Sequence, residues 1–358
     1  MPDARQTPLD SLFSYQAPLE SAIKTIFDEF AEQLPEHSHG VQWALNTIEE
    51  YALRPSKRIR GCLAAFTYDN ALHQKVSPEG VRLGVVLEFI QNHLLIVDDV
   101  MDRSSVRRGA PTVHELHKTQ FNSGDRVSDS AAILVGMLAQ QLSSLALTKI
   151  NVEASRVLLS SRSVYRNIAI TDIGQFDDIH QTVVNAPVSY EDLIRRYSQK
   201  SSYYSFVAPI EAALLLAGRP TDRSRCDAEA FGIPAGVAFQ LHDDYIGIFG
   251  NATHTGKHNL DDIHEGKYTV LVHNALEQAD AADARQLRSI LANEEAGEAE
   301  LELVRSILKR SGSVDRAMEE TMTYARAAKQ AANKAASWDE SYAEVLCALV
   351  DFAVERTS

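Results

Sequence analysis

Three carboxylates interrupt an apolar run at Asp98-Asp99-Val100-Met101-Asp102. Asp98 and Asp102 stand four residues apart, so on a helix both project from one face, about one turn from each other. Carboxylates beside a buried face repel one another and resist desolvation, so a cation should lie between them. Oxygen-only ligands at this spacing suit a hard ion such as Mg²⁺, which commonly bridges to a phosphate. Taken alone, such a motif is more often a solvated acidic helix face.

A second acidic pair, Asp243-Asp244, occurs far downstream in a matching setting. Apolar residues flank it, and a polar loop with a glycine follows each acidic motif, at Gly109 and at Gly250. Two helices that face each other could direct these carboxylates into one cavity and hold several Mg²⁺ ions around a diphosphate. Such a site could ionise a phosphate ester as well as bind it.

Basic residues supply the counter-charges that a diphosphate site needs. Lys57 and Arg60 open an apolar segment three residues apart, so we predict that they share a helix face. Arg107-Arg108 follows the first acidic motif. Guanidinium groups bind phosphate oxygens through two parallel hydrogen bonds, and lysine adds a compact charge. Further basic candidates are Lys200 beside Ser201, Lys257 and Lys267. A single basic cluster is usually a solvated surface, but its combination with two acidic motifs favours a diphosphate site.

Helical periodicity, which would position these residues, runs through almost the whole chain. Ser77-Pro78-Glu79 is typical of a helix start, and Ser189 to Asp192 has capping-box spacing. No convincing alternating strand run, Asn-Gly or Asp-Gly hairpin or Gly/Ser linker is found. The sequence therefore predicts one all-α domain over residues 16–358 after an N-terminal tail of residues 1–15. The polar loop from Gly250 to Gly266 is the best candidate for a lid.

Composition excludes several classes of protein. The 358 residues are 45% hydrophobic, enough for a large core, and the net charge of -14 argues against nucleic-acid or anionic-membrane binding. In so acidic a protein, the positive potential that a diphosphate site needs must come from basic residues and metal ions at the site itself. Cys62, Cys226 and Cys347 are too few and too far apart for a disulfide framework or a zinc motif, which favours a reducing cytoplasm. Polar residues break the longest apolar region, 131–147, and residues 1–15 lack a signal-peptide core, so we expect no membrane span.

Taken in order, these motifs resemble those of the trans-isoprenyl diphosphate synthases, the family of farnesyl and geranylgeranyl diphosphate synthases. The resemblance covers most of the chain. The matching segments are Lys57-Arg58-Ile59-Arg60, Glu88-Phe89-Ile90-Gln91, Asp98 to Asp102 with Arg107-Arg108-Gly109, Gly174-Gln175-Phe176-Asp177, Lys200-Ser201, Phe239-Gln240 with Asp243-Asp244, and the loop with Lys257 and Lys267. Each segment is weak alone, and the ordered set is highly specific.

The resemblance implies a single-domain bundle of long helices around a central cavity, and a homodimer. The implied reaction condenses isopentenyl diphosphate with an allylic diphosphate, using Mg²⁺, with three ions in each active site. Asp98, Asp102 and Asp243 would bind metal. The implied catalytic residues are Asp98, Asp99, Asp102, Lys200, Gln240, Asp243 and Asp244. Isopentenyl diphosphate would be bound by Lys57, Arg60, Gln91 and Arg108. The allylic diphosphate would be bound by Arg107, Lys200, Ser201, Gln240, Lys257 and Lys267.

Several positions depart from the family pattern. Gly247 stands where the second motif usually has a third aspartate, as in an active subgroup of the family. Pro55-Ser56 replaces a double glycine and Gly61 replaces a proline, which affects the expected local loop geometry rather than the charges. Ser201 replaces the usual threonine. Gly136-Met137 stands where many relatives have Gly-Asp, a change for which the sequence offers no physical account.

Product length depends in this family on side chains about one turn before the first acidic motif. Here those positions are His93 and Leu94. Farnesyl synthases often have aromatic rings there, so this pocket floor should be lower. We therefore favour a twenty-carbon product, geranylgeranyl diphosphate, over a fifteen-carbon one.

Three other classes remain as alternatives. A class I terpene cyclase would share the fold but would not need the Lys57, Arg60 and Arg108 set, because it binds one diphosphate; it would also form product without isopentenyl diphosphate. A non-catalytic partner subunit would have lost aspartates that are present here. A di-iron carboxylate bundle would need paired Glu-x-x-His motifs, and none accompanies the aspartates.

Overall fold

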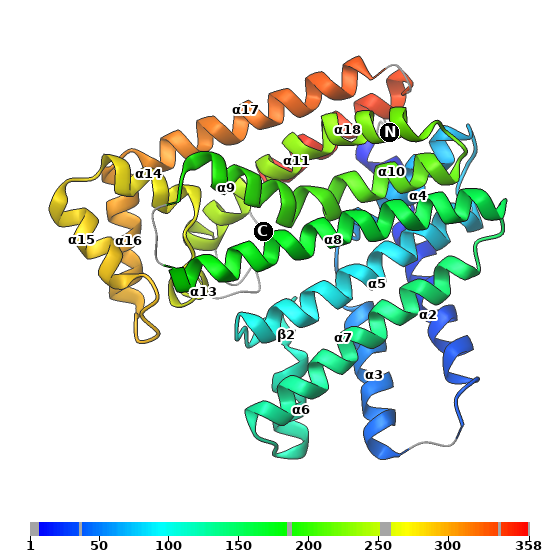
Figure 1. The fold of residues 1–358 in the computed structure, drawn as a ribbon, viewed down its shortest axis with the longest axis horizontal. Coiled ribbons are helices and arrows are strands. Elements are labelled where there is room, and N and C mark those ends of the chain that lie inside the picture. Colours follow the sequence, from blue (N-terminus) through cyan, green and yellow to red (C-terminus); the bar gives the residue numbers. More distant parts are fainter. Residues whose placement is uncertain (1–6, 36–37, 185–187, 251–258, 336–337, 357–358) are drawn as a thin grey trace, which may run out of the picture. The chain divides into compact units, whose positions relative to one another are not determined.

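The computed structural model describes residues 7–35, 38–184, 188–250, 259–335 and 338–356, and these are almost entirely helical (Figure 1). In the first half of the chain the elements are α1 (Pro8–Phe13), α2 (Gln16–Ala31), α3 (His39–Leu53), α4 (Ile59–Ala71), α5 (Pro78–Met101), β1 (Val106–Arg107), β2 (Ala110–Pro111), α6 (Val113–Phe121), α7 (Asp125–Thr148) and α8 (Ala154–Val184). They are followed by α9 (Tyr190–Tyr197), the π-helix η1 (Ser198–Val207), α10 (Ala208–Leu216), α11 (Thr221–Phe249), α13 (Asp261–His264), α14 (Val270–Gln278), α15 (Ala281–Ile290), α16 (Glu298–Arg310), α17 (Ser313–Lys334) and α18 (Glu340–Glu355). The predicted all-α fold is confirmed.

The chain divides into two compact units, which are described separately below. Unit 1 comprises Met1–Ser163 and Pro209–Ser224, and unit 2 comprises Val164–Ala208 and Arg225–Ser358. The long helices α8 and α11 contribute residues to both. The prediction of a single domain over residues 16–358 stays a prediction.

The core of unit 1 is built around α5, which packs along α4 and α7. The predicted start of α5 is confirmed, because the Ser77 hydroxyl accepts a hydrogen bond from the Gly80 amide and Pro78 occupies the first turn. Close packing of α4 on α5 requires glycine at two positions. A Cβ at Gly84 would lie 2.6 Å from the Gly61 carbonyl oxygen, and one at Gly61 would lie 2.8 Å from Glu88 Cγ. Gly61, a departure from the family pattern, therefore allows these helices to approach.

Residues 8–15, which the sequence placed in a tail, pack against the rest of unit 1. Leu12 is completely buried, and the buried Tyr15 hydroxyl donates a 2.8 Å hydrogen bond to Asp69. Apolar side chains at this spacing leave water when α1 lies on α4, which is the physical reason for a helix here rather than an extended tail. The predicted boundary between residues 15 and 16 stays a prediction.

Unit 2 contains two clusters of buried apolar side chains. One joins the end of α11 to α13–α17 and includes Leu287, Val304 and Ile307. The other joins α9 to α11 and includes Leu193 and Val237. The predicted cap of α9 is present, since the Ser189 hydroxyl accepts a 3.1 Å hydrogen bond from the Asp192 amide. These clusters fix α9, η1 and the C-terminal half of α11, which carry the predicted site residues of this unit.

The structure contains a small hairpin that the sequence analysis missed. β1 and β2 pair antiparallel, with Val106 opposite Pro111 and Arg107 opposite Ala110. The two loop residues Arg108 and Gly109 both have positive φ, at 55° and 72°. This is the backbone of a primed two-residue turn, for which the usual sequence signal is Asn-Gly or Asp-Gly. The first residue here is arginine, so the signal was absent although the turn is formed.

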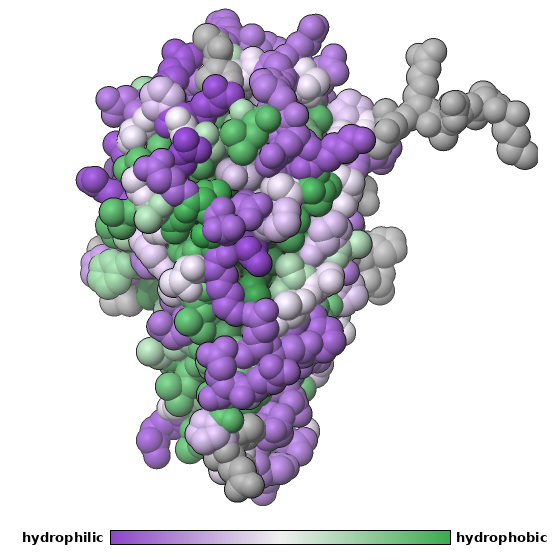
Figure 2. Space-filling model, turned by 90° about the vertical axis from the view of Figure 1, so that its right-hand side faces the viewer, coloured by the Kyte–Doolittle hydropathy of each residue, from purple (hydrophilic) through white to green (hydrophobic). Residues whose placement is uncertain are grey.

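Two helices, α5 and α7, are long and apolar enough to cross a membrane by length and composition alone, a test that core helices of other proteins also pass. In α5, 72% of the most apolar 18-residue stretch is buried within the protein, as in a core helix. In α7, only 44% of the corresponding stretch is buried. On the face shown in Figure 2, apolar side chains reach the surface in patches among hydrophilic ones.

Candidate active site

The first acidic motif lies at the C-terminal end of α5. Asp102 caps the helix, and its amide donates a 2.8 Å hydrogen bond to the Asp98 carbonyl oxygen, so the two residues are one turn apart as predicted. A helix C-terminus carries partial negative charge and disfavours carboxylates. The local structure therefore concentrates negative charge at one point, and this point requires a cation.

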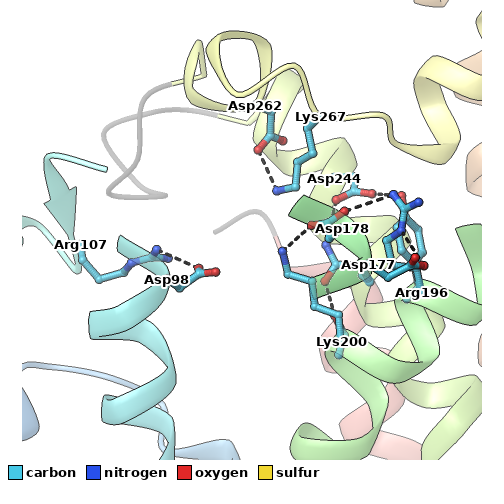
Figure 3. Close-up of polar contacts among 12 residues, drawn as sticks. Asp98, Arg107, Asp177, Asp178, Arg196, Lys200, Asp244, Asp262 and Lys267 are labelled. Atoms are coloured by element: carbon cyan, nitrogen blue, oxygen red, sulfur yellow. Dashed lines mark hydrogen bonds and ion pairs between the residues drawn. The ribbon is translucent and has the colours of Figure 1, made fainter. Parts of the chain in front are cut away.

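Arg107, from β1, supplies part of this positive charge (Figure 3). Its Nη2 lies 3.5 Å from Asp98 Oδ2, and its Nε donates a 2.6 Å hydrogen bond to Asp99 Oδ1. Burial alone would lower the pKa of Arg107, but the Asp99 and Asp98 carboxylates raise it above its ordinary value. Asp99 is completely buried and also accepts a hydrogen bond from Tyr51. In this arrangement Asp99 positions Arg107, and Asp98 is the more accessible carboxylate.

The hairpin that carries Arg107 and Arg108 is held by Arg54, a buried arginine at the C-terminal end of α3. Arg54 donates hydrogen bonds to the carbonyl oxygens of Arg107 (3.2 Å) and Pro111 (3.0 Å), one on each strand. Arg108 adopts a left-handed backbone, which costs roughly 1 kcal/mol for a residue with a Cβ. Strain of this kind persists where the surroundings fix it, commonly at functional sites.

Arg108 belongs to a basic cluster that is incompletely neutralised. Burial lowers its pKa, and the neighbouring Arg58 and Arg60 lower it further, while Tyr51 and Glu88 act in the opposite direction. Its buried Nη1 has no hydrogen-bond partner among the described residues. Desolvated guanidinium groups with donors to spare form a site for an anion.

The basic motif at the start of α4 differs from the prediction in one respect. The helix begins at Ile59, so Lys57 precedes it and does not share a helix face with Arg60. Between them Arg58 has a left-handed backbone and is buried, paired with Glu88 at 3.3 Å and Glu20 at 3.1 Å. The prediction of a shared face was wrong because the buried Arg58 ion pairs hold this segment outside the helix.

Gln91 and the two predicted chain-length residues lie on α5. Gln91 is buried, and its Oε1 has no hydrogen-bond partner among the described residues. Leu94 is one turn before Asp98, as expected. His93 is rotated about 140° from Asp98 around the helix, and its Nδ1 lies 3.0 Å from the Gly136 carbonyl oxygen of α7. Although both residues lie about one turn before the motif, His93 therefore does not project from the helix face that carries Asp98.

In unit 2, Lys200 and Ser201 lie in η1, a stretch of wider helical turns that often marks functional sites. Gly174 of α8 allows η1 to approach closely, because a Cβ there would lie 2.6 Å from the Lys200 amide nitrogen. Asp178 of α8 accepts a 2.7 Å hydrogen bond from Lys200 Nζ and a 3.2 Å bond from Arg196 (Figure 3). Burial would raise the pKa of Asp178, but Lys200, with Lys267 and Arg196, holds it below its ordinary value.

Asp178 and Arg196 are residues that the sequence analysis did not select. Asp178 directly follows the Gly174-Gln175-Phe176-Asp177 segment, so its position was a usable signal. Arg196 stands one turn before Lys200, among polar residues that resemble an ordinary exposed helix, and nothing in the sequence distinguishes it. It is buried in the structure.

A hydrogen-bonded chain joins Ser201, Gln240 and Asp244. The Ser201 hydroxyl donates to Gln240 Oε1 at 2.5 Å, and Gln240 Nε2 donates to Asp244 Oδ1 at 2.8 Å. Tyr197 also donates to Asp244. Burial raises the pKa of Asp244 to about 7, against the opposing effects of Lys267 and these hydrogen bonds. Asp243, by contrast, is half exposed and pairs with Arg356 at 2.6 Å. The two adjacent aspartates therefore differ in role, with Asp244 internal and Asp243 accessible.

The structure accounts for the glycine at position 247. A Cβ at Gly247 would lie 2.5 Å from Asp262 Oδ2, so this glycine leaves room for the Asp262 carboxylate. Lys267 pairs with Asp262 at 3.0 Å (Figure 3). Burial opposes the charge of Lys267, and Asp262, Glu265, Asp244 and Asp178 raise its pKa well above the ordinary value. Lys257 and most of the predicted lid, residues 251–258, lie outside the described residues.

A family model described as polyprenyl synthetase matches residues 41–308. This chain belongs to that family. It is 26% identical to the farnesyl pyrophosphate synthase of Saccharomyces cerevisiae over 77% of this chain and 73% of that protein. It is 29% identical to the geranylgeranyl diphosphate synthase of Sulfolobus acidocaldarius over 76% of this chain and 79% of that protein.

A solved geranylgeranyl pyrophosphate synthase from Corynebacterium glutamicum, complexed with isoprenyl diphosphate and magnesium, superposes with a TM-score of 0.88. It is 25% identical, and the match covers 96% of this chain and 99% of that one. The resemblance inferred from the motifs is thus confirmed, and the chain is a prenyl-transferring enzyme.

The carboxylates of this polyprenyl synthetase suit a hard divalent cation. Asp98 and Asp102 offer only oxygen donors at a helix end with excess negative charge. Asp243, which is half exposed, also offers only oxygen donors. Within the described parts of the chain, no group of three or more His, Cys, Asp and Glu side chains is close enough to hold a metal ion unaided. A metal such as Mg²⁺, which takes one or two carboxylates together with water and substrate phosphates, fits this donor set.

Proposed function

We propose that this polyprenyl synthetase condenses isopentenyl diphosphate with an allylic diphosphate, in a Mg²⁺-dependent reaction, and makes geranylgeranyl diphosphate. The observation that carries the proposal is the pairing of the accessible Asp98 carboxylate at the end of α5 with Arg107 of the hairpin, next to Arg108. The curated relatives named above make farnesyl and geranylgeranyl diphosphate, by their names. The alternative product is farnesyl diphosphate.

In this proposal Asp98, Asp102 and Asp243 hold up to three Mg²⁺ ions in each site. The bound metal would neutralise charge that develops on the diphosphate leaving group. The allylic diphosphate is also bound by Arg107, Lys200, Ser201, Gln240, Lys257 and Lys267. Asp178 positions the Lys200 ammonium through its 2.7 Å hydrogen bond, and Asp262 positions Lys267. These contacts keep both cations fixed before substrate arrives, which reduces reorganisation during ionisation.

Isopentenyl diphosphate is assigned to the basic cluster of unit 1, namely Lys57, Arg60, Arg108 and the amide of Gln91. The buried and unpartnered atoms of Arg108 and Gln91 support this assignment, because such atoms are normally paired with a ligand or water. The double bond of isopentenyl diphosphate attacks the allylic cation. The proton that is then lost goes to the departing diphosphate, whose oxygens are the base that the reaction itself supplies.

The decisive experiment is a product analysis. Purified protein would be incubated with isopentenyl diphosphate, Mg²⁺ and dimethylallyl, geranyl or farnesyl diphosphate, and the chain length of the product measured. A main product of twenty carbons is expected. Fifteen carbons would favour the farnesyl alternative. Product from an allylic substrate without isopentenyl diphosphate would indicate a terpene cyclase, and absence of any product would indicate a partner subunit.

Replacing Arg108 by alanine is expected to raise the KM for isopentenyl diphosphate by about 10- to 100-fold, equivalent to the loss of a charge-assisted hydrogen bond. The KM for the allylic substrate should change much less. Lys267→Ala is the matched comparison, since Lys267 is assigned to the allylic diphosphate. It should raise the KM for the allylic substrate and change the KM for isopentenyl diphosphate much less. Steady-state kinetics with each substrate varied in turn would measure both. An Arg108→Ala effect confined to the allylic KM would show that the assignment is wrong.

Product length should respond to Leu94 and His93. A prenyl chain whose diphosphate is bound near Asp98 runs along the α5 face toward Leu94, so Leu94→Phe should shorten the main product by about five carbons. His93 faces α7 rather than the Asp98 side of α5, so it would act on the part of the tail that passes between α5 and α7. There His93→Phe should shorten the product, and His93→Ala should lengthen it. Overpacking costs about 1–3 kcal/mol, enough to favour release over another condensation. Unchanged product length in all three active variants would place the floor elsewhere.

We further propose that the enzyme is cytoplasmic and forms a homodimer through the exposed side of α7. Leu134 is 64% exposed and Met137 49%, and Val127, Ile133 and Leu145 are exposed on the same helix. Apolar surface of this extent is typical of an interface. A second copy of the chain is the occupant that the resemblance implies. Met137, which replaces the usual aspartate, would add to the apolar surface buried there.

A further inference from the structure

Arg356, the last residue that the structure describes, lies against the catalytic half of α11 through three contacts. Its Nη2 donates a 2.6 Å hydrogen bond to Asp243 Oδ1. Its carbonyl oxygen accepts a 2.8 Å hydrogen bond from His242 Nε2. Its guanidinium carbon lies 4.2 Å above the ring of Phe239. Backbone, charge and ring contacts thus all hold the same residue in place.

The sequence of α11 makes this arrangement possible. Phe239 and Asp243 are four residues apart, so they lie on one helix face, and His242 is adjacent to it. An arginine side chain that stacks on Phe239 therefore reaches the Asp243 carboxylate without leaving the ring. The side chain of Arg356 is only 15% exposed, whereas that of Asp243 is 50% exposed. The arginine is consequently held by the protein, while the carboxylate is half exposed to solvent.

We propose that Arg356 is a counter-ion that a divalent metal must displace from Asp243, so that Arg356 sets the Mg²⁺ concentration at which the second acidic motif is filled. The inference rests on the proposed function, in which Asp243 is a metal ligand. A guanidinium 2.6 Å from Asp243 Oδ1 already neutralises part of the charge that would attract a metal ion. A second cation on the same carboxylate is repelled at such short distances, so a metal should bind more weakly while the guanidinium is in place.

The size of the effect follows from the contacts that must be broken. A half-exposed ion pair and a cation–π contact are each modest, and together they correspond to about a 3- to 10-fold change in metal affinity. Displacement need not break the backbone contact with His242, so the chain can stay attached to α11 while the side chain turns away. Arg356 therefore raises the Mg²⁺ concentration that is needed to fill this site. It is a positioning residue for Asp243 rather than a catalytic one.

The test is a calorimetric Mg²⁺ titration of the protein in the presence of inorganic diphosphate, which supplies the phosphate ligands, with the Mg²⁺-dependent rise in Tm as a second readout. Arg356→Gln should bind Mg²⁺ about 3- to 10-fold more tightly than the wild type. Arg356→Lys keeps the charge and should stay within about 3-fold of the wild type. The control is Arg195→Gln, since Arg195 is an exposed arginine of the same unit that pairs with Asp192 at 2.5 Å. Its Mg²⁺ affinity should be unchanged.

A second variant separates this inference from the proposed function. In an Asp243→Asn background, Arg356→Gln should have no further effect on Mg²⁺ affinity, because the ion pair is already lost. If Asp243→Asn binds Mg²⁺ as well as the wild type, Asp243 is not a ligand and the metal assignment fails. If Asp243→Asn weakens binding while Arg356→Gln leaves it equal or weaker than in the wild type, the competition between Arg356 and the metal is overturned.

Discussion

Replacing Asp98 by alanine is expected to lower turnover by about 10²–10³-fold or more, the range seen when a single group that stabilises transition-state charge is removed. The side chain of Asp98 is 23% exposed, and its carboxylate lies 3.5 Å from the Arg107 guanidinium. The proposed role is to hold a metal that neutralises the leaving diphosphate. Asp243→Ala should have an effect of similar size.

The fold should survive the Asp98→Ala change. Removing a carboxylate from a helix C-terminus relieves its unfavourable interaction with the helix dipole, and Arg107 keeps its closer partner Asp99. Circular dichroism and Tm should therefore stay close to the wild type. Asp28→Ala is a suitable control, because Asp28 is an exposed helical aspartate paired with Lys24, and it should keep full activity. Full activity of Asp98→Ala, or of the wild type without divalent metal, would refute the mechanism.

Replacing Arg107 by methionine is expected to destabilise the protein by about 3–5 kcal/mol, the usual effect of removing one partner from a buried ion pair. Asp99 is completely buried and accepts a 2.6 Å hydrogen bond from Arg107 and a longer one from Tyr51. Without the guanidinium, Asp99 must either stay charged with less compensation or take up a proton. Both options raise the free energy of the folded state. Urea unfolding followed by circular dichroism would measure the change.

Arg103→Met is the matched control for the stability measurement. Arg103 lies four residues before Arg107 and pairs with Asp129 at 2.7 Å, but its side chain is 66% exposed. Its replacement should change the free energy of unfolding by no more than about 0.5 kcal/mol. Adding Asp99→Asn to Arg107→Met should recover part of the lost stability, because no buried charge then remains. Equal stability of the Arg103 and Arg107 variants would mean that Asp99 is neutralised by another group.

The chemistry of this protein was readable from the sequence because it depends on residue type and short spacing. Asp98 and Asp102 lie one turn apart on any helix, whatever surrounds that helix. The ordered motifs identified the family, and helical periodicity identified the all-α fold. The start of α5 at Ser77-Pro78 was also predictable, since a cap depends only on residues next to one another in the chain.

Predictions that depended on where a helix begins, or on which side chains are buried, were less successful. Lys57 and Arg60 have helical spacing, but the ion pairs of the buried Arg58 with Glu88 and Glu20 keep Lys57 out of α4. The hairpin at Arg108-Gly109 lacks the usual turn residues and is fixed by hydrogen bonds from Arg54, more than fifty residues earlier in the chain.

Only the tertiary structure separated the roles of neighbouring residues with identical chemistry. Asp98 and Asp99, Asp243 and Asp244, and Arg107 and Arg108 are equivalent by type, yet Asp99, Asp244 and Arg107 are buried, whereas Asp98, Asp243 and Arg108 are more exposed. The same applies to Gly247, whose missing side chain leaves space for Asp262, and to Arg356, which lies on Asp243 from the far end of the chain. The sequence by itself determined which chemical groups the protein carries, because residue type and spacing are local properties. The structure decided which of them are buried, paired or open to a ligand, because burial and pairing depend on contacts between residues far apart in the chain.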